Sequence, residues 1–290
     1  MLGLHIITKT CENLRSIANY PISKAEAYTM TIEVDPDWWK TLFDDIYLLT
    51  DARSVGDESL TRLEVDVVCE LLPMDAGHKI LDLCGGHGRH SFELCKRGFE
   101  ACTLLDYSHA LIDVAKEKAR VNNYSLKVVR CDARQIDLGP DQFDHVLIMG
   151  NSLGYIQQSD ADKKILSEAF KVLRPGGWLL VDVTDGTAVK KFFNPNAWHE
   201  VGEDTVVCRQ RELRENAVRA RELVISKKDG LIRDRTYAVR LYEPQTLASL
   251  IEMTGFGQIK IHTDFSPHRF EGDYGFMNRR MLGIGQKPKD

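Results

Sequence analysis

The chain has 290 residues, a formal net charge of -5 at pH 7 and a hydrophobic share of 43%. This length can bury one large core, and there is no low-complexity tract and no apolar stretch long enough to span a bilayer. A negative net charge gives no global attraction to a phosphate backbone. We therefore expect a soluble globular protein that binds neither membrane nor nucleic acid.

The cysteine content indicates a reducing compartment. The seven cysteines form an odd set with no C-x-x-C pair and no zinc-ligand spacing. The amino-terminal apolar run, within residues 1–10, is too short for a secretory signal. We expect a cytoplasmic protein without a bound metal, in which residues 1–36 form a flexible leader.

Two helices are expected before the first strand. Residues 35–49 and 57–72 place apolar side chains at helical spacing, and Asp37 and Asp57 are plausible helix starts. Trp38 and Trp39 lie in the first of these segments, where core packing is the expected role.

A glycine-rich turn follows the first strand. Residues 80–83 form a short apolar run that contains Asp82, and Gly85, Gly86 and Gly88 follow before a helix expected over 91–97. Such a turn exposes backbone N–H groups and the positive end of a helix dipole at the carboxyl edge of a sheet. The pattern predicts a nucleotide-type site.

Strands and helices alternate after this turn. Strands are expected at 100–106, 126–131, 143–149 and 178–183, with helices at 108–121 and 160–173 and a turn at 174–177. This order predicts a mostly parallel α/β sheet with helices on both faces.

Residues 199–242 interrupt the alternation with polar and apolar residues in period-two order, and Lys228, Asp229 and Gly230 stand between two of the runs. They are expected to form an inserted antiparallel β lid. A helix over 243–254 and two antiparallel strands, near 259–265 and 281–287, complete the core, which therefore comprises 37–198 and 243–290.

The glycine turn resembles the first motif of class I S-adenosylmethionine-dependent methyltransferases, which runs acid-x-Gly-x-Gly-x-Gly. Asp82, Gly86 and Gly88 match this motif, Cys84 replaces its first glycine, and Gly85 takes a variable place. A bacterial small-molecule type is further indicated by the runs at 82–90, 151–155, 174–177 and 240–242. The resemblance implies a Rossmann-like seven-stranded sheet and S-adenosyl-L-methionine as the methyl donor.

Several residues are expected at the cofactor. Asp106 ends the second strand, where an acid can accept hydrogen bonds from both ribose hydroxyls. The resemblance implies that Asp132 accepts a hydrogen bond from the adenine amine and that adjacent backbone groups contact the adenine ring. Arg89 could reach the cofactor carboxylate. The remaining expected cofactor contacts are Tyr107, Cys131, Ala133, Gly150, Asn151 and Ser152.

Methyl transfer from a sulfonium depends mainly on aligning the two substrates and excluding water, so the sequence need not contain a recognisable set of catalytic residues. A general base can still assist, so Tyr155 and His199 are candidates. Arg240 and Tyr242 share one face of the last lid strand, where Arg240 could bind a carboxylate or phosphate or form a surface ion pair. The other lid arginines, such as Arg209 and Arg211, alternate with glutamates and are expected on a solvated face.

The function expected is methyl transfer to a small-molecule acceptor, with an anionic acceptor favoured by the arginine content. Three alternatives stay open: a noncatalytic S-adenosylmethionine-binding protein, a protein or RNA methyltransferase, and an NAD-dependent oxidoreductase. The last is disfavoured because Ser91 stands where the dinucleotide fingerprint needs its third glycine.

Overall fold

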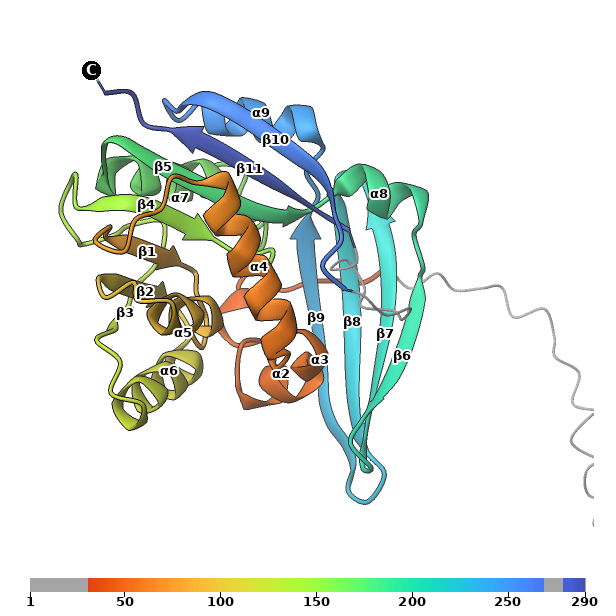
Figure 1. Ribbon diagram of the computed structural model, residues 1–290. Coiled ribbons are helices and arrows are strands. Elements are labelled where there is room, and N and C mark those ends of the chain that lie inside the picture. The colour runs from red at the N-terminus through yellow and green to blue at the C-terminus, as the bar shows by residue number, and fades with distance from the viewer. Residues whose placement is uncertain (1–30, 269–278, 290) are drawn as a thin grey trace, which may run out of the picture. The chain divides into compact units, whose positions relative to one another are not determined.

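The computed structural model describes residues 31–268 and 279–289, so most of the expected leader lies outside the described residues. Its main sheet has seven strands in the order β10-β11-β5-β4-β1-β2-β3 (Figure 1). Their bounds are β1 Ile80–Leu83, β2 Cys102–Asp106, β3 Lys127–Arg130, β4 Phe143–Ile148, β5 Leu173–Thr184, β10 Gly257–Phe265 and β11 Arg280–Gln286.

Strand direction confirms the expected fold class. Strands β1 to β5 pair in parallel, whereas β11 pairs antiparallel with both β5 and β10. The sheet is therefore mostly parallel, with its one reversed strand near an edge, as the Rossmann-like expectation requires.

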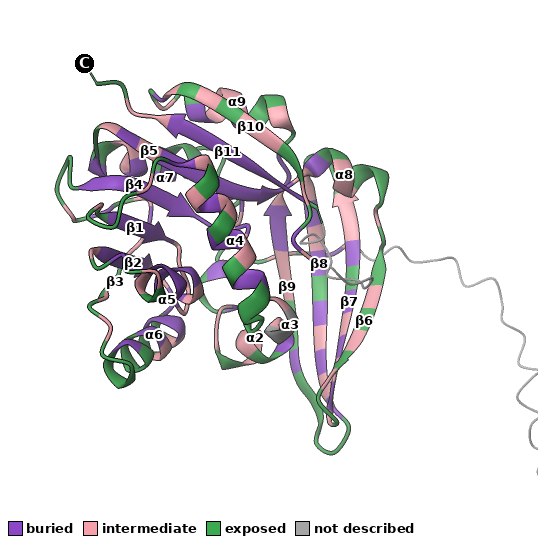
Figure 2. Cartoon of the chain, in the orientation of Figure 1, coloured by how far each residue is buried: buried purple, intermediate pink, exposed green. Residues whose placement is uncertain are grey.

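Helices cover both faces of this sheet (Figure 1). On one face lie α4 (Glu58–Leu71), α5 (Arg89–Lys96) and α6 (His109–Val121). On the other lie α7 (Ala161–Val172) and α9 (Pro244–Glu252). The central strands are buried on both sides (Figure 2). The apolar continuity of these strands follows from this double covering.

A second, antiparallel sheet stands beside the carboxyl ends of the parallel strands (Figure 1). It has the order β6-β7-β8-β9, with β6 Asn196–Val201, β7 Thr205–Arg214, β8 Ala217–Ser226 and β9 Gly230–Arg240. We call these four strands the lid. It begins three residues earlier than expected, and α8 (Gly186–Lys191) connects it to β5.

The prediction of one helix over residues 35–49 was wrong. Residues 35–49 contain a short 3-10 turn, η1 (Trp38–Lys40), and then α2 (Asp45–Thr50), which is followed by α3 (Ala52–Val55). The Asp44 side chain accepts a hydrogen bond from the Tyr47 backbone N–H at 3.0 Å, so it caps a new helix inside the segment. Asp57, by contrast, caps α4 as expected.

The expected turn at 174–177 was also wrong, because these residues lie inside β5. Gly176 takes a φ of 81°, and its backbone N–H donates to the Lys287 carbonyl at 2.9 Å. The pairing of β4 with β5 shifts register between Phe143 and His145. A bulge therefore accommodates the glycines without ending the strand.

Candidate active site

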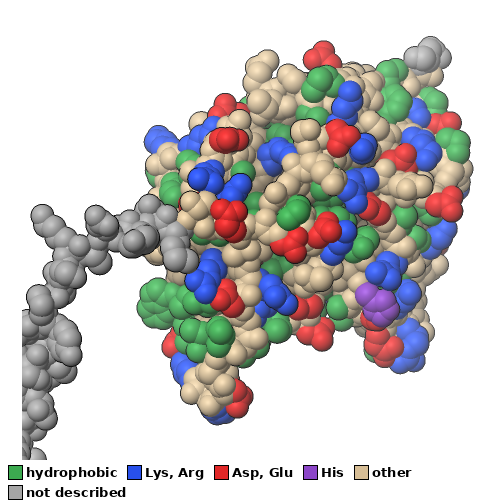
Figure 3. Space-filling view, turned by 180° about the vertical axis from the view of Figure 1, so that it is seen from behind, with side chains coloured by type: hydrophobic (Ala, Val, Ile, Leu, Met, Phe, Trp, Pro, Cys, Tyr) green, Lys and Arg blue, Asp and Glu red, His purple; other side chains and the backbone are tan. Residues whose placement is uncertain are grey.

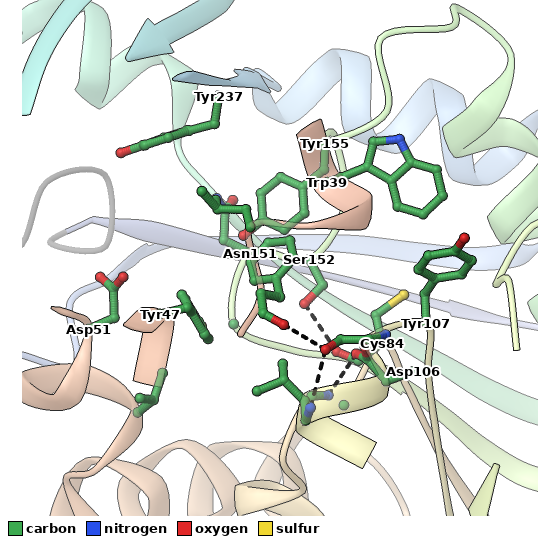
Figure 4. A pocket seen from close by; sticks show the side chains of 18 of the residues that line it. Trp39, Tyr47, Asp51, Cys84, Asp106, Tyr107, Asn151, Ser152, Tyr155 and Tyr237 are labelled. Atoms are coloured by element: carbon green, nitrogen blue, oxygen red, sulfur yellow. Dashed lines mark hydrogen bonds between the residues drawn. The ribbon is translucent and has the colours of Figure 1, made fainter. Parts of the chain in front are cut away.

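One cavity joins the carboxyl edge of the sheet, the segment from η1 to α3, and the inner face of the lid (Figure 4). Its walls come from segments more than a hundred residues apart in the chain. The labelled side chains in Figure 4 surround it: Trp39, Tyr107, Cys84 and Asp106 lie at one end, and Tyr47, Asp51 and Tyr237 at the other.

The glycine turn after β1 forms the floor of the cavity. A Cβ at Gly85 would lie 2.6 Å from the Asp82 carboxyl carbon, and one at Gly88, whose φ is 84°, would lie 2.7 Å from Leu104. Asp82 is buried beneath the turn, where it accepts a hydrogen bond from the Ser91 hydroxyl at 2.7 Å. The backbone of the turn therefore packs directly against Asp82 of β1, the strand that precedes it.

Cys84 occupies a backbone conformation that normally favours glycine, with a φ of 61°. Its thiol lines the cavity, and burial, followed by the nearby charges of Asp106 and Asp82, raises its pKa well above the usual range. The thiol therefore stays protonated and acts as a packing group.

Asp106 ends β2 and holds the glycine turn in place. Its two carboxylate oxygens accept hydrogen bonds from the backbone N–H groups of Gly86 and Ser108, both at 2.8 Å (Figure 4). Burial raises its pKa despite these bonds. The carboxylate faces the cavity beside Tyr107, whose ring contacts that of Trp39 at a centroid distance of 4.8 Å.

The loop after β3 brings Cys131, Asp132 and Ala133 to the same end of the cavity. The Arg134 side chain donates two hydrogen bonds to the Asp132 carboxylate, from Nε at 3.0 Å and from Nη2 at 2.6 Å. Burial acts to raise the Asp132 pKa, but these bonds and the Arg134 charge hold it below its usual value. Asp132 is thus a charged acceptor at the rim of the cavity.

A buried ion network supports the opposite side of the glycine turn. Glu64 on α4 pairs with Arg89, His90 and Arg280, and Arg280 also pairs with Asp182 at 2.8 Å. Burial alone would raise the Glu64 pKa, but the Arg280 and Arg89 charges hold it well below the usual value. The network fixes Arg89 in the cavity wall.

The loop after β4 carries Gly150, Asn151 and Ser152 into the cavity wall. Gly150 donates its N–H to the Asp182 carboxylate at 2.9 Å, and Asn151 accepts from the Thr184 N–H at 2.8 Å. Both residues have left-handed backbones, with φ values of 68° and 64°. The loop is therefore rigidly joined to β5.

An aromatic group faces the lid end of the cavity. Tyr155 contacts Trp38 and Phe43 with centroid distances of 5.4 Å each, and Trp38 contacts Tyr237 of the lid at 5.7 Å. Phe43 also contacts Tyr47 at 5.0 Å. Of the four expected catalytic residues, Tyr155 is the one that lines the cavity.

The expectation of a solvated lid face was wrong for Arg209 and Arg211, which are 9% and 5% exposed and line the cavity. Glu222, 3% exposed, pairs with Arg209 at 2.8 Å and with Arg233 at 2.7 Å. The sequence contained a signal for the burial of both arginines. Side chains alternate along a strand, so Arg209 and Arg211 lie on the same face of β7 as the apolar Val207.

The other expected catalytic residues lie outside the cavity lining. His199 on β6 is 3.1 Å from the Thr50 carbonyl through its Nε2. Arg240 and the Tyr242 hydroxyl both bind the Asp162 carboxylate, and Arg240 also donates to the Gln157 carbonyl at 3.1 Å. These contacts join Arg240 and Tyr242 to the loop after β4 and to α7, whose Asp162 lines the cavity.

No group of three or more His, Cys, Asp or Glu side chains among the described residues is arranged to hold a metal ion. No helix in the same part of the chain is long and apolar enough to cross a bilayer. Figure 3 shows Lys and Arg side chains interspersed with Asp and Glu over the face it presents.

Comparison with known proteins agrees with this geometry. Residues 80–177 match the sequence family described as methyltransferase domain. This part of the chain is therefore similar to methyltransferase domains, and the core has the fold of solved S-adenosylmethionine-dependent methyltransferases.

Particular relatives are similar over different lengths. The ubiquinone/menaquinone biosynthesis C-methyltransferase UbiE of Roseobacter denitrificans is 34% identical over 46% of this chain and 52% of its own length. The chain thus matches about half the length of this curated relative. The CcbJ methyltransferase of Streptomyces caelestis superposes with a TM-score of 0.69 at 21% identity, covering 88% of this chain and 99% of that one.

A third similar protein has its cofactor bound. CalS10, an amino pentose methyltransferase from Micromonospora echinaspora solved with S-adenosylmethionine, superposes with a TM-score of 0.61 at 16% identity. This alignment covers 84% of this chain and 98% of that one. At these identities the two structures establish the fold.

Proposed function

We propose that this protein binds S-adenosyl-L-methionine and transfers its methyl group to a small-molecule acceptor. The observation that carries the proposal is the single cavity that connects the glycine turn and Asp106 to a lid-covered chamber. The methyltransferase domain match over 80–177 and the cofactor bound in CalS10 support it.

The residues present fit this cofactor. Gly85 and Gly86 line the cavity with backbone alone, and the close packing of Gly85 on Asp82 holds the turn in this position. Asp106 and Asp132 are acceptors suited to the ribose hydroxyls and the adenine amine, and the rings of Trp39 and Tyr107 line the same cavity. Arg89, fixed by Glu64, supplies a cation for the amino-acid carboxylate.

The bound cofactor would supply an activated methyl group on a sulfonium. The chain's own residues orient the two reactants, and the lid excludes water from the space between them. Gly150, Asn151 and Ser152 form the wall where donor and acceptor meet, because they lie between the glycine turn and Tyr155. The cytoplasmic location stays a prediction.

The buried arginine pairs change the expectation of an anionic acceptor. Arg209 and Arg233 are paired with Glu222, and Arg240 is paired with Asp162. The arginine content that favoured an anion is therefore largely neutralised within the protein, and we propose an acceptor without that requirement.

Calorimetry with S-adenosylmethionine tests the proposal. The wild-type protein should bind it, and Asp106→Ala should bind at least about tenfold more weakly, because charge-assisted hydrogen bonds are lost. Asp113→Ala is the matched control, since Asp113 is an exposed acid on α6. Absence of binding by the wild-type protein would refute the function. Binding without transfer to any component of a metabolite extract would instead favour the noncatalytic alternative.

A further inference from the structure

We propose that the methyl acceptor is a small polar primary or secondary amine, held in the lid-end chamber by tyrosine hydroxyls and by Asp51. This inference deepens the proposed function and rests on it. We use the name acceptor chamber for the part of the cavity lined by Phe43, Tyr47, Asp51, Tyr155 and Tyr237.

The first argument is that three half-buried tyrosines line the cavity with hydroxyls that have no partner among the described residues. The described residues place no hydrogen-bonding atom against the hydroxyls of Tyr47, Tyr155 and Tyr237, and all three side chains line the cavity. Burial raises the pKa of each phenol, so each hydroxyl stays protonated and can donate. Hydroxyls that face a cavity can bind the polar atoms of a ligand there, so a ligand with several polar atoms would fit these three.

The second argument is that the one carboxylate among the chamber's lining residues is already engaged, because both oxygens of Asp51 accept from Arg209 Nη2, at 3.1 and 3.2 Å. Methylation of an alcohol needs removal of its proton, which is best done by a group that titrates near neutral pH. The protonated phenols cannot do this, and His199 is bound to Thr50 outside the cavity lining. Burial, followed by the Arg89 charge, lowers the His87 pKa to about 4, so that imidazole is a weak base.

An amine that loses its proton to solvent before it binds avoids this requirement, because the nitrogen then enters the chamber with its lone pair free. The lone pair forms the new bond to the methyl carbon, the carbon–sulfur bond breaks with its electron pair moving to sulfur, and the positive charge passes to nitrogen. The resulting ammonium group then loses a proton to solvent. A neutral alcohol would need its proton removed during the same step.

The third argument is that the chamber suits this shift of charge. Asp51 lies at its edge with a side chain 33% exposed, and its two oxygens are 3.1 and 3.2 Å from Arg209 Nη2. A carboxylate and the faces of Phe43 and Tyr155 stabilise a nitrogen that becomes cationic. The ring planes of Phe43 and Tyr155 are stacked at 30°, which makes one continuous aromatic wall.

The test uses S-adenosylmethionine labelled with ¹³C in its methyl group, incubated with the full-length protein and a bacterial metabolite extract. The labelled product is separated, and the atom that carries the methyl group is identified by mass spectrometry and carbon NMR. We expect a methyl group on nitrogen. A methyl group on oxygen, carbon or sulfur would overturn the inference and leave the methyltransferase function intact.

Variants then test the chamber residues with the amine so identified. Tyr237→Phe and Asp51→Asn should each lower kcat/KM for that amine by about tenfold, the effect of one lost hydrogen bond. The calorimetric Kd for S-adenosylmethionine should change less than about twofold, since neither residue lies at the cofactor end. Tyr124→Phe is the control, because Tyr124 packs on Phe92 outside the cavity. Unchanged kcat/KM in both chamber variants would contradict the assignment.

Discussion

At the scale of single residues, the glycine turn shows how closely the backbone approaches a side chain. The Gly85 Cα stands directly over the Asp82 carboxylate, and the shortest contact of an added Cβ would be 2.6 Å. Asp82 cannot move aside easily, because it is 1% exposed and is held by the Ser91 hydroxyl. Steric room, rather than a special φ value, explains the glycine at this position.

We therefore expect Gly85→Ala to lower the free energy of unfolding by about 1–3 kcal/mol, the usual cost of overpacking. It should also weaken binding of S-adenosylmethionine, because the turn would shift toward the cavity. Gly77→Ala is the matched control, since its added Cβ would make only an ordinary contact at 3.6 Å. Urea unfolding and calorimetry measure both effects, and equal stability of the two variants would contradict the steric account.

A buried histidine at the other end of the sheet couples stability to pH. His145 on β4 is 2% exposed and lies 2.9 Å from His78. Burial, followed by the His78 charge, lowers its pKa to about 4. The folded protein therefore keeps this imidazole neutral well below pH 6.5, whereas the unfolded chain protonates it near that pH.

The sign follows from proton linkage. Stability from the neutral state of His145 is full above about pH 6.5 and is lost as the pH falls toward 4, by about 3 kcal/mol in all. His145→Gln should flatten this part of the curve of unfolding free energy against pH. His109→Gln, an exposed histidine, should leave it unchanged. An equally steep acid loss in His145→Gln would refute the assignment.

At the scale of elements, the lid is joined to the amino-terminal helices through charged side chains on its inner face. Arg209 reaches Asp51 at the end of α2, and Arg233 reaches the α2 cap Asp44 at 2.8 Å. Both arginines share Glu222 of β8. Burial alone would raise the Glu222 pKa, but the two arginines hold it below the usual value.

Glu222→Gln should therefore destabilise the protein by about 3–5 kcal/mol, because two buried guanidinium groups lose their shared carboxylate. Asp234→Asn removes an exposed ion pair with Arg221 on the same sheet and should cost at most about 1 kcal/mol. Denaturant unfolding of both variants gives the comparison. Similar small losses would mean that the pairing contributes little to the lid's attachment.

At the scale of the whole molecule, one arginine connects the terminal strand to the cofactor end of the cavity. Arg280 begins β11, is 0% exposed, and pairs with Asp182 of β5 and Glu64 of α4. Glu64 in turn holds Arg89 in the cavity wall, and Asp182 holds the Gly150 N–H. The carboxyl-terminal strand thus stabilises two walls of the site.

Arg280→Met should lower the free energy of unfolding by about 3–5 kcal/mol, since two buried carboxylates lose a common cation. It should also weaken S-adenosylmethionine binding through the loosened Arg89. The neighbouring Arg279→Met is the matched control, because that side chain is exposed and stacks on Phe192. A loss of stability without any change in the calorimetric Kd would limit the network to a structural role.

Local patterns in the sequence were sufficient for the sheet, its mostly parallel order and the glycine turn, because periodicity, caps and glycine spacing act over a few residues. They also placed Asp106 and Asp132 after strand ends, and both residues line the cavity; their contacts with the cofactor stay predictions. They failed where a side chain's partner is distant in the chain. Arg240 binds Asp162, and Arg209 is buried against Asp51. Only the tertiary structure decides such contacts, because burial and charge pairing depend on which segments meet in space.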